Sequence, residues 1–265
     1  MFRWLRRKLI RRAPFPPAWR ILLHRNMRFW SGLTADEQAR IEDEIRFFIA
    51  ERHWEGCGGL TLTEEMKVII AAQACRLLLG RPGERYANVT TILVYPSGYF
   101  TGPQPTPVLG GPSTRVVPGG GTPVLGQAHD RGPVILSWRH TLEGALMDED
   151  GENLVLHEFA HKLDMANGVV DGTPAMDSAE QAREWHEVMT SARDRLAHDP
   201  RYGLGAPLRI YALTNPAEFF AVATEVFFER PQDMDEWDPD LYRVLARWYR
   251  QDPKARMAAL GDEPE

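Results

Sequence analysis

The sequence predicts an α+β protein in which a short region of strands lies between two helical regions. Capping-box patterns precede amphipathic segments between residues 34 and 80, and apolar, β-branched runs at 89–95 and 133–138 have the composition of strands. From about residue 150 onward, apolar residues again follow helical spacing. With 265 residues, of which 43% are hydrophobic, the chain is long enough to bury a sizeable core.

The first twelve residues are strongly basic. They contain six arginine or lysine residues, and three prolines follow between positions 14 and 17, so the unbroken apolar stretch of a secretory signal is absent. We interpret residues 1–20 as a solvated basic tail. The alternative is a short amphipathic helix that contacts anionic lipid or an acidic partner.

Residues 21–85 are expected to be helical. Thr34 stands three residues before Glu37, and Thr61 stands three residues before Glu64, which is the spacing of a capping box at the start of a helix. Apolar residues at helical spacing follow each box, and glycine and proline end the second segment. This region is most simply a scaffold for the rest of the chain.

Residues 86–255 are expected to form the main domain, followed by a short tail at 256–265. The two predicted strands of this domain enclose residues 102–126, which are rich in glycine and proline. This composition disfavours a helix or a central strand, so we predict a long loop, with room for a hairpin. Loops of this length in compact domains are usually functional lids or disordered segments.

The composition excludes several classes of protein. The formal net charge is −6, so nothing points to direct binding of nucleic acid. No run approaches the roughly 18 apolar residues of a membrane-spanning helix. The two cysteines, Cys57 and Cys75, do not make a disulfide framework, which fits a reducing cytoplasm. We therefore expect a cytoplasmic protein, with the bacterial periplasm as the alternative location.

The segment most informative about chemistry contains His157, Glu158 and His161 in the pattern H-E-x-x-H. An apolar run precedes it and no glycine or proline interrupts it, so it is expected to be helical. Residues i and i+4 share a helix face, so both imidazoles can bind one Zn²⁺ ion at about 2.0–2.1 Å. Glu158 then lies beside a metal-bound water as a general base. The alternative is a pair of histidines that cap or pack a helix.

A catalytic zinc ion usually has three protein ligands, and we expect the third on a later helix. The segment that starts with Asn215 and Pro216 has the cap and first-turn residues of a helix and is largely apolar. It contains Glu218 and Glu225, which lie seven residues apart and therefore on one side. A buried carboxylate needs a partner or a metal ion. We choose Glu218 as the ligand and Glu225 as a supporting residue or salt-bridge partner, with a surface charge as the alternative for Glu225.

Two further residues are candidates near this site. Asp164 lies on the same helical face, one turn after His161, where a carboxylate can orient an imidazole N–H; the alternative is an exposed charge at the helix end. Tyr211 lies seven residues before Glu218, and a phenol can donate a hydrogen bond to a developing oxyanion. From the residues alone, packing is the simpler role for this tyrosine. We expect no cofactor besides the metal ion.

Two segments together resemble a known family. HEFAHKLDMANG (157–168) and YALTNPAEFFAVATEVFF (211–228) are similar to the Mlc titration factor A family, bacterial zinc metallopeptidases related to the catalytic domain of anthrax lethal factor. Further similarity, including LYRVLARWYRQDP (241–253), extends over much of 30–253 and leaves the basic tail outside.

The resemblance implies a site, a fold and an activity. It implies His157, His161 and Glu218 as zinc ligands, Glu158 as the catalytic base and Tyr211 as the residue that stabilises the transition state. It also implies a zincin-like α+β domain, with a small mixed sheet and active-site helices behind N-terminal helices, and an aminopeptidase-type activity on short peptides. The founding member binds Mlc, the repressor that controls the glucose phosphotransferase system, so an Mlc-type repressor is a candidate partner.

One main hypothesis and two alternatives follow. We expect a zinc peptidase in which an extended peptide substrate pairs with an edge strand at 133–139. The first alternative is a module that binds a transcriptional regulator and retains only vestigial peptidase activity. The second alternative is a protein that contacts the membrane surface through its basic N-terminus.

Overall fold

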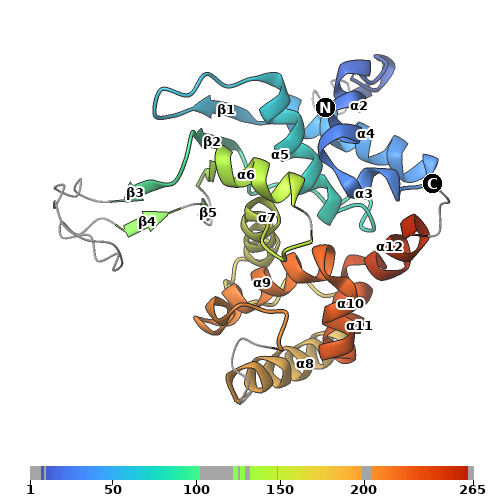
Figure 1. Cartoon of the computed structure of the whole chain (residues 1–265), viewed down its shortest axis with the longest axis vertical. Helices are drawn as coiled ribbons and strands as arrows, with labels where there is room; N and C mark the ends of the chain where they lie inside the picture. Colours follow the sequence, from blue (N-terminus) through green and yellow to red (C-terminus); the bar gives the residue numbers. More distant parts are fainter. Residues whose placement is uncertain are drawn as a thin grey trace.

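Helix α7 (Leu154–Asp164) lies between two groups of elements (Figure 1). One group is a small sheet with the N-terminal helices, and the other is a set of C-terminal helices. This combination confirms the predicted α+β class. The computed structural model describes residues 7, 8, 10–101, 122–124, 126–128, 132–147, 149–198 and 205–261.

The N-terminal helices begin where capping residues allow them to. The capping box at Thr34 is present, because Thr34 and Glu37 each accept a hydrogen bond from the backbone N–H of the other. The second helix is capped by Thr63 rather than by Thr61, because its first helical residue is Glu64. The helices described in this region are α2 (Pro17–Asn26), α3 (Arg28–Ser31), α4 (Ala35–Glu51) and α5 (Glu64–Leu77).

The basic N-terminal segment lies against α4 where the structure describes it. Arg7 pairs with Glu51 at 2.5 Å, and Arg11 pairs with Asp43 at 3.1 Å. Arg7 and Arg11 therefore pair with an acidic helix of their own chain, and the Arg11 side chain stays 60% exposed. If the basic N-terminus contacted a membrane surface, as in the second alternative, Arg7 and Arg11 would be two of the residues that it uses, and both are paired with α4 here. Residues 1–6 lie outside the described part of the chain.

The main sheet has the strand order β1-β2-β6-β5. The strands β1 (His53–Gly56), β2 (Thr91–Tyr95) and β6 (Val134–Ser137) run parallel, and β5 (Gly126–Ala128) pairs antiparallel with β6. Strands β2 and β6 confirm the two predicted strands, and their inward residues are completely buried.

The position of β6 corrects the expected edge strand at 133–139. Because β6 lies between β2 and β5 and pairs with both, a peptide cannot add to it. The edge strand on this side of the sheet is β5, which lies next to α7. Pairing with β6 gives β5 its extended conformation, although its glycine-containing sequence predicts a loop.

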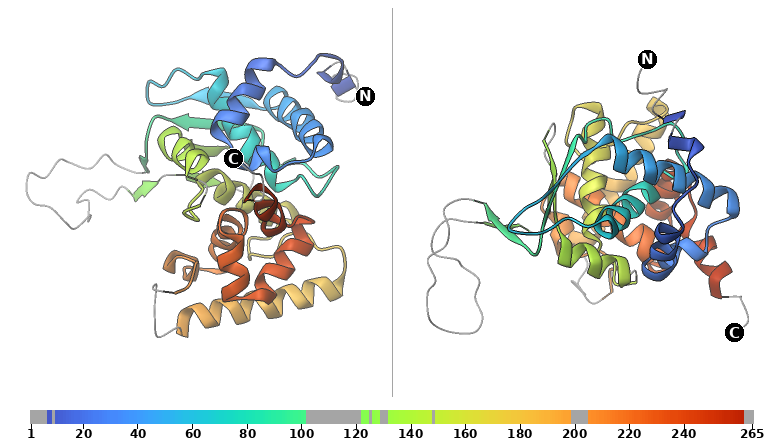
Figure 2. Two further views of the ribbon diagram at one scale, coloured as in Figure 1. Left: turned by 45° about the vertical axis from the view of Figure 1, so that its right-hand side comes forward. Right: turned by 90° about the horizontal axis from the view of Figure 1, so that it is seen from above.

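A two-stranded ribbon projects from the body beside this sheet (Figures 1 and 2). It consists of β3 (Tyr99–Thr101) and β4 (Thr122–Val124), which pair antiparallel. The predicted loop at 102–126 therefore contains paired backbone at its C-terminal end, in line with a hairpin. The greater part of that loop, residues 102–121, lies outside the described residues.

The second half of the described chain is mainly helical, and the predicted helix start at Asn215 is confirmed. Asn215 accepts a hydrogen bond from the backbone N–H of Glu218, and Pro216 occupies the first helical position. None of the described helices combines the length and apolar character that crossing a bilayer requires. The remaining elements are α6 (Trp138–Leu146), the 3-10 turn η1 (Met165–Asn167), α8 (Ala179–His198), the 3-10 turn η2 (Ile210–Leu213), α9 (Pro216–Glu229), α10 (Pro231–Trp237), α11 (Pro239–Tyr249) and α12 (Pro253–Gly261).

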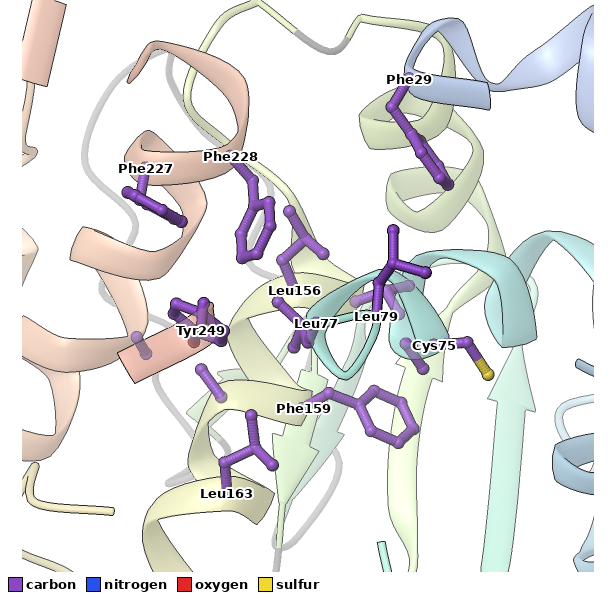
Figure 3. Packing of buried hydrophobic residues seen from close by; sticks show 14 of the residues in the cluster. Phe29, Cys75, Leu77, Leu79, Leu156, Phe159, Leu163, Phe227, Phe228 and Tyr249 are labelled. Atoms are coloured by element: carbon purple, nitrogen blue, oxygen red, sulfur yellow. The ribbon is translucent and has the colours of Figure 1, made fainter. Parts of the chain in front are cut away.

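The core holds α7 from two sides (Figure 3). Toward the N-terminal helices, the ring of Phe159 lies 4.7 Å from that of Tyr86. Toward the C-terminal helices, α7 packs against α9, and α9 is held in turn by α11, where the rings of Phe228 and Tyr249 lie 4.9 Å apart. Complete burial of a large apolar side chain contributes about 1.5–3 kcal/mol, so these contacts fix the helix that carries the H-E-x-x-H motif.

Candidate metal centre

Helix α7 places His157 and His161 on one face. The helix starts after Asn153, whose side chain accepts a hydrogen bond from the backbone N–H of Leu156 at 3.0 Å. The centroids of the two imidazole rings are 4.8 Å apart, and their Nε2 atoms are 3.2 Å apart. Both nitrogens therefore reach the same position beside the helix, as the i, i+4 spacing predicts.

Helix α9 brings Glu218 to this position from a distant part of the chain. Its Oε2 atom lies 3.1 Å from Nε2 of His157 and 3.4 Å from Nε2 of His161. The cap at Asn215 starts the helix so that Glu218 occupies its first turn. Burial alone raises the pKa of Glu218, but the two imidazoles outweigh burial and hold this pKa well below its usual range.

The three side chains fit a metal ion. One donor atom from each of His157, His161 and Glu218 lies within 4.8 Å of the others. Apart from the two imidazoles, the buried Oε2 atom of Glu218 has no hydrogen-bond partner within the described part of the chain. Two imidazole nitrogens and one carboxylate oxygen are a donor set that catalytic zinc sites use, with a fourth position left for water.

A buried carboxylate orients His157. Glu225 is 1% exposed, and its Oε1 atom accepts a hydrogen bond from Nδ1 of His157 at 2.8 Å. This bond keeps one imidazole proton on Nδ1, so Nε2 is the nitrogen available to a metal ion. Burial lowers the pKa of His157, but Glu225 and Glu218 raise it more, to about 10. Without a metal ion, Nε2 therefore holds a proton at neutral pH, which a metal ion has to displace.

Glu158 is almost completely buried beside the two histidines. It is 4% exposed, and its Oε2 atom has no hydrogen-bond partner among the described residues. Burial raises the pKa of Glu158 to about 7, against the opposing effect of His157 and His161. A carboxyl group with a pKa near neutrality can both accept and donate a proton, as general acid–base chemistry requires.

Tyr211 flanks the site from η2. Its ring centroid lies 6.1 Å from that of His157, and its side chain is half exposed. Partial burial and the neighbouring Glu218 carboxylate raise the pKa of Tyr211 to about 12. The phenol therefore keeps its proton at neutral pH and can donate a hydrogen bond.

A comparison with known proteins places this chain in a family. The model of the glucose-regulated metallo-peptidase M90 family matches residues 1–250. The chain belongs to this family. An uncharacterized protein of Synechocystis sp. is 33% identical over 251 residues, which cover 94% of this chain and 89% of the relative. Mlc titration factor A of Yersinia pestis is 30% identical over 272 residues, which cover 100% of this chain and 97% of the relative.

These matches confirm the resemblance to the Mlc titration factor A family and extend it. The similarity seen in the sequence leaves the basic tail outside 30–253, whereas the M90 family model begins at residue 1. The alignment with the Yersinia pestis relative also covers the whole chain. The basic segment is therefore part of the region that M90 proteins share, in agreement with the ion pairs of Arg7 and Arg11 to α4.

In this M90 chain, Asp164 makes a different contact from the one expected. Asp164 is completely buried, and its Oδ2 atom accepts a hydrogen bond from the backbone N–H of Gly172 at 3.0 Å. Among the described residues, neither Oδ1 of Asp164 nor Nδ1 of His161 has a hydrogen-bond partner. The carboxylate therefore binds the loop after α7 through Oδ2, and it interacts with His161 through charge without a hydrogen bond between them.

The loop that Asp164 binds also supports the start of α9. Gly172 has a φ of +76°, and a Cβ atom there would lie 2.3 Å from the carbonyl oxygen of Pro216. Only glycine permits this conformation and approach without strain. The contact places the loop after α7 against the turn of α9 that carries Glu218.

Sequence reasoning missed Arg209 and Asn153. Nη2 of Arg209 donates to Oε1 of Glu225 at 2.6 Å, and the backbone N–H of Asn153 donates to Oε2 at 2.6 Å. The side chain of Asn153 also donates to Glu229 at 2.9 Å. Asn153 could have been found from the sequence, because an asparagine directly before the H-E-x-x-H helix is a typical N-cap residue. No local pattern indicates a role for Arg209, because its sequence context is that of a surface arginine.

Proposed function

We propose that this chain is a zinc-dependent peptidase of the aminopeptidase type. The observation that carries the proposal is the convergence of His157, His161 and Glu218 on one position, with Glu158 beside them. Membership of the M90 metallo-peptidase family supports hydrolysis of peptide bonds. The aminopeptidase specificity rests on the resemblance to the Mlc titration factor A family.

The side chains of the site divide the chemistry of hydrolysis among them. His157, His161 and Glu218 would hold the zinc ion, which when bound supplies a Lewis acid that acidifies water and polarises the scissile carbonyl. Glu158 accepts a proton from the attacking water and delivers it to the leaving amine. Tyr211 donates its phenol hydrogen to the oxyanion that develops on the substrate.

The proposed catalytic domain is zincin-like and comprises residues 86–255, and residues 21–85 support it with their helices and add strand β1 to its sheet. An extended peptide would add to the edge strand β5 through backbone hydrogen bonds. This choice of strand is supported by the position of β5 beside α7, the helix that carries the two histidines.

The proposal is tested with protein purified without chelators. We expect elemental analysis to find zinc bound to the chain and mass spectrometry to find short peptides shortened from their N-termini. Glu158→Gln should keep its zinc and lose hydrolysis, whereas His157→Ala should lose both. The matched control is Glu143→Gln, which removes an exposed carboxylate that pairs with Arg139 outside the site. Full activity of Glu158→Gln, or wild type without zinc, would contradict the proposal.

A second function is favoured by the name of the Yersinia relatives. Because these relatives are called Mlc titration factor A, we also propose that this chain binds a transcriptional repressor of the Mlc type. In the alternative hypothesis this binding is the main function and hydrolysis is vestigial. A pull-down with a purified Mlc-type repressor compares wild type with Glu158→Gln. Equal binding, with an equal effect on repression, supports a binding module, and binding by neither protein contradicts it.

A further inference from the structure

Arg209 joins three parts of the candidate site. It precedes η2 directly and stands two residues before Tyr211. Its Nη2 atom lies 2.6 Å from Oε1 of Glu225 on α9, and its Nη1 atom lies 3.1 Å from Oε2 of Glu152, just before α7. One guanidinium group therefore bridges η2, α9 and the start of α7.

Arg209 and the candidate metal ligand His157 bind the same carboxylate oxygen of Glu225. Oε1 of Glu225 accepts hydrogen bonds from both Nη2 of Arg209 and Nδ1 of His157. The Glu225 side chain is 2% exposed, and a carboxylate buried to this extent is costly without an opposite charge. When His157 binds a metal ion as a neutral imidazole, Arg209 still places a positive charge against this carboxylate.

We propose that Arg209 is a positioning residue of the metal centre, which holds Glu225 against His157 and anchors the turn that carries Tyr211. The inference rests on the proposed zinc-dependent function and deepens it. Arg209 acts on the His157 ring through Glu225, and on Tyr211 through the backbone of η2. A guanidinium suits this role, because its planar group donates from separate nitrogens to two carboxylates at fixed geometry.

Replacement of Arg209 should weaken metal binding in a graded way. Arg209→Gln leaves Glu225 without its guanidinium partner, and partners that orient zinc ligands typically contribute about 10–100-fold to metal affinity. We expect a loss of affinity in this range. Arg209→Lys keeps the charge without the planar group and should lose less. Arg195→Gln is the matched control, because Arg195 pairs at 3.1 Å with the nearly buried Asp238, outside the site.

The test measures the zinc affinity of the full chain by competition with a chromogenic chelator, which requires no enzymatic activity. Thermal unfolding in EDTA, measured in parallel, separates a loss of stability from a loss of metal affinity. We expect Arg195→Gln to equal wild type, Arg209→Lys to bind more weakly and Arg209→Gln to bind most weakly. Equal zinc affinity of wild type and Arg209→Gln overturns the inference, whatever the two stabilities are.

Failure of the proposed function gives a different result. If wild type binds zinc no more tightly than His157→Ala, the metal centre is refuted, and the role of Arg209 with it. If wild type binds zinc but hydrolyses no peptide, the peptidase proposal fails, while the affinities still decide the role of Arg209. If Arg209→Gln does not fold, Arg209→Lys decides the question, because an affinity equal to wild type overturns the inference.

Discussion

Nδ1 of His157 donates a hydrogen bond of 2.8 Å to Oε1 of Glu225. This bond joins a candidate metal ligand on α7 to a buried carboxylate on α9, two helices that pack against each other. Glu218, on the same side of α9 as Glu225, contacts both histidines. Helix α9 thus supplies one candidate ligand and the support of another, so the geometry of the centre depends on the packing of α7 against α9.

Glu225→Gln is expected to weaken zinc binding by about 10–100-fold. The amide oxygen can still accept the hydrogen bond from His157, but the neutral side chain no longer strengthens the imidazole as a ligand or neutralises Arg209. Glu143→Gln is the matched control, because Glu143 pairs with Arg139 outside the site. Competition with a chelator measures both variants. Unchanged affinity of Glu225→Gln would show that this carboxylate does not support the ligand.

Removal of zinc is expected to destabilise the folded chain. The proposed ligands come from two helices, so the unfolded chain does not hold them together. Zinc at about 1,000 times its dissociation constant stabilises the native state by about 4 kcal/mol. EDTA should therefore lower the melting temperature of wild type and leave that of Glu218→Ala, which lacks one ligand, nearly unchanged. An equal effect of EDTA on both proteins would place the metal ion elsewhere.

Glu229 is expected to make the metal-free chain less stable as the pH rises. Burial raises the pKa of Glu229 from 4.5 to about 8, so the folded chain binds this proton more tightly than the unfolded chain does. The bound proton contributes its full stability at a pH below 4.5, the pKa of Glu229 in the unfolded chain. This contribution is lost as the pH rises through about 8, the pKa in the folded chain.

Urea unfolding of metal-free wild type and Glu229→Gln measures this effect of Glu229. The glutamine does not ionise, so the variant should gain stability relative to wild type as the pH rises from about 5 to about 9. The size of this change is on the order of a few kcal/mol. A difference in stability that stays constant across this pH range would refute a raised pKa for Glu229.

Local sequence patterns predicted the parts of the site that depend on local geometry. His157 and His161 share a helix at a spacing of four, so helical periodicity alone brings their rings together. Asn215 and Pro216 predicted the start of α9, and a glutamate in an otherwise apolar helix indicated a special role for Glu218. The contact between α9 and α7 depends on the tertiary fold. The sequence indicates it only indirectly, because a catalytic zinc ion needs a third protein ligand besides the two histidines.

Features that depend on pairing across the chain were not predicted. The glycine-containing strand β5 is extended because β6 pairs with it, and β1 is too short and polar to show a strand pattern. Arg209 has the context of a surface arginine, since only the fold brings Glu225 to it. Helical spacing associates Asp164 with an imidazole, but it does not predict the hydrogen bond from the backbone N–H of Gly172, which comes from a loop with no periodicity.

Tyr211→Phe is expected to slow peptide hydrolysis without changing zinc affinity. The variant keeps the ring, whose centroid lies 6.1 Å from that of His157, and removes only the hydroxyl that would donate to the oxyanion. Loss of one such donor lowers kcat by about 10²–10³-fold in other hydrolases. Because the side chain is half exposed, the melting temperature should stay close to that of wild type. Steady-state kinetics at saturating zinc separate kcat from KM, and a loss confined to KM would assign Tyr211 to substrate binding rather than to the transition state.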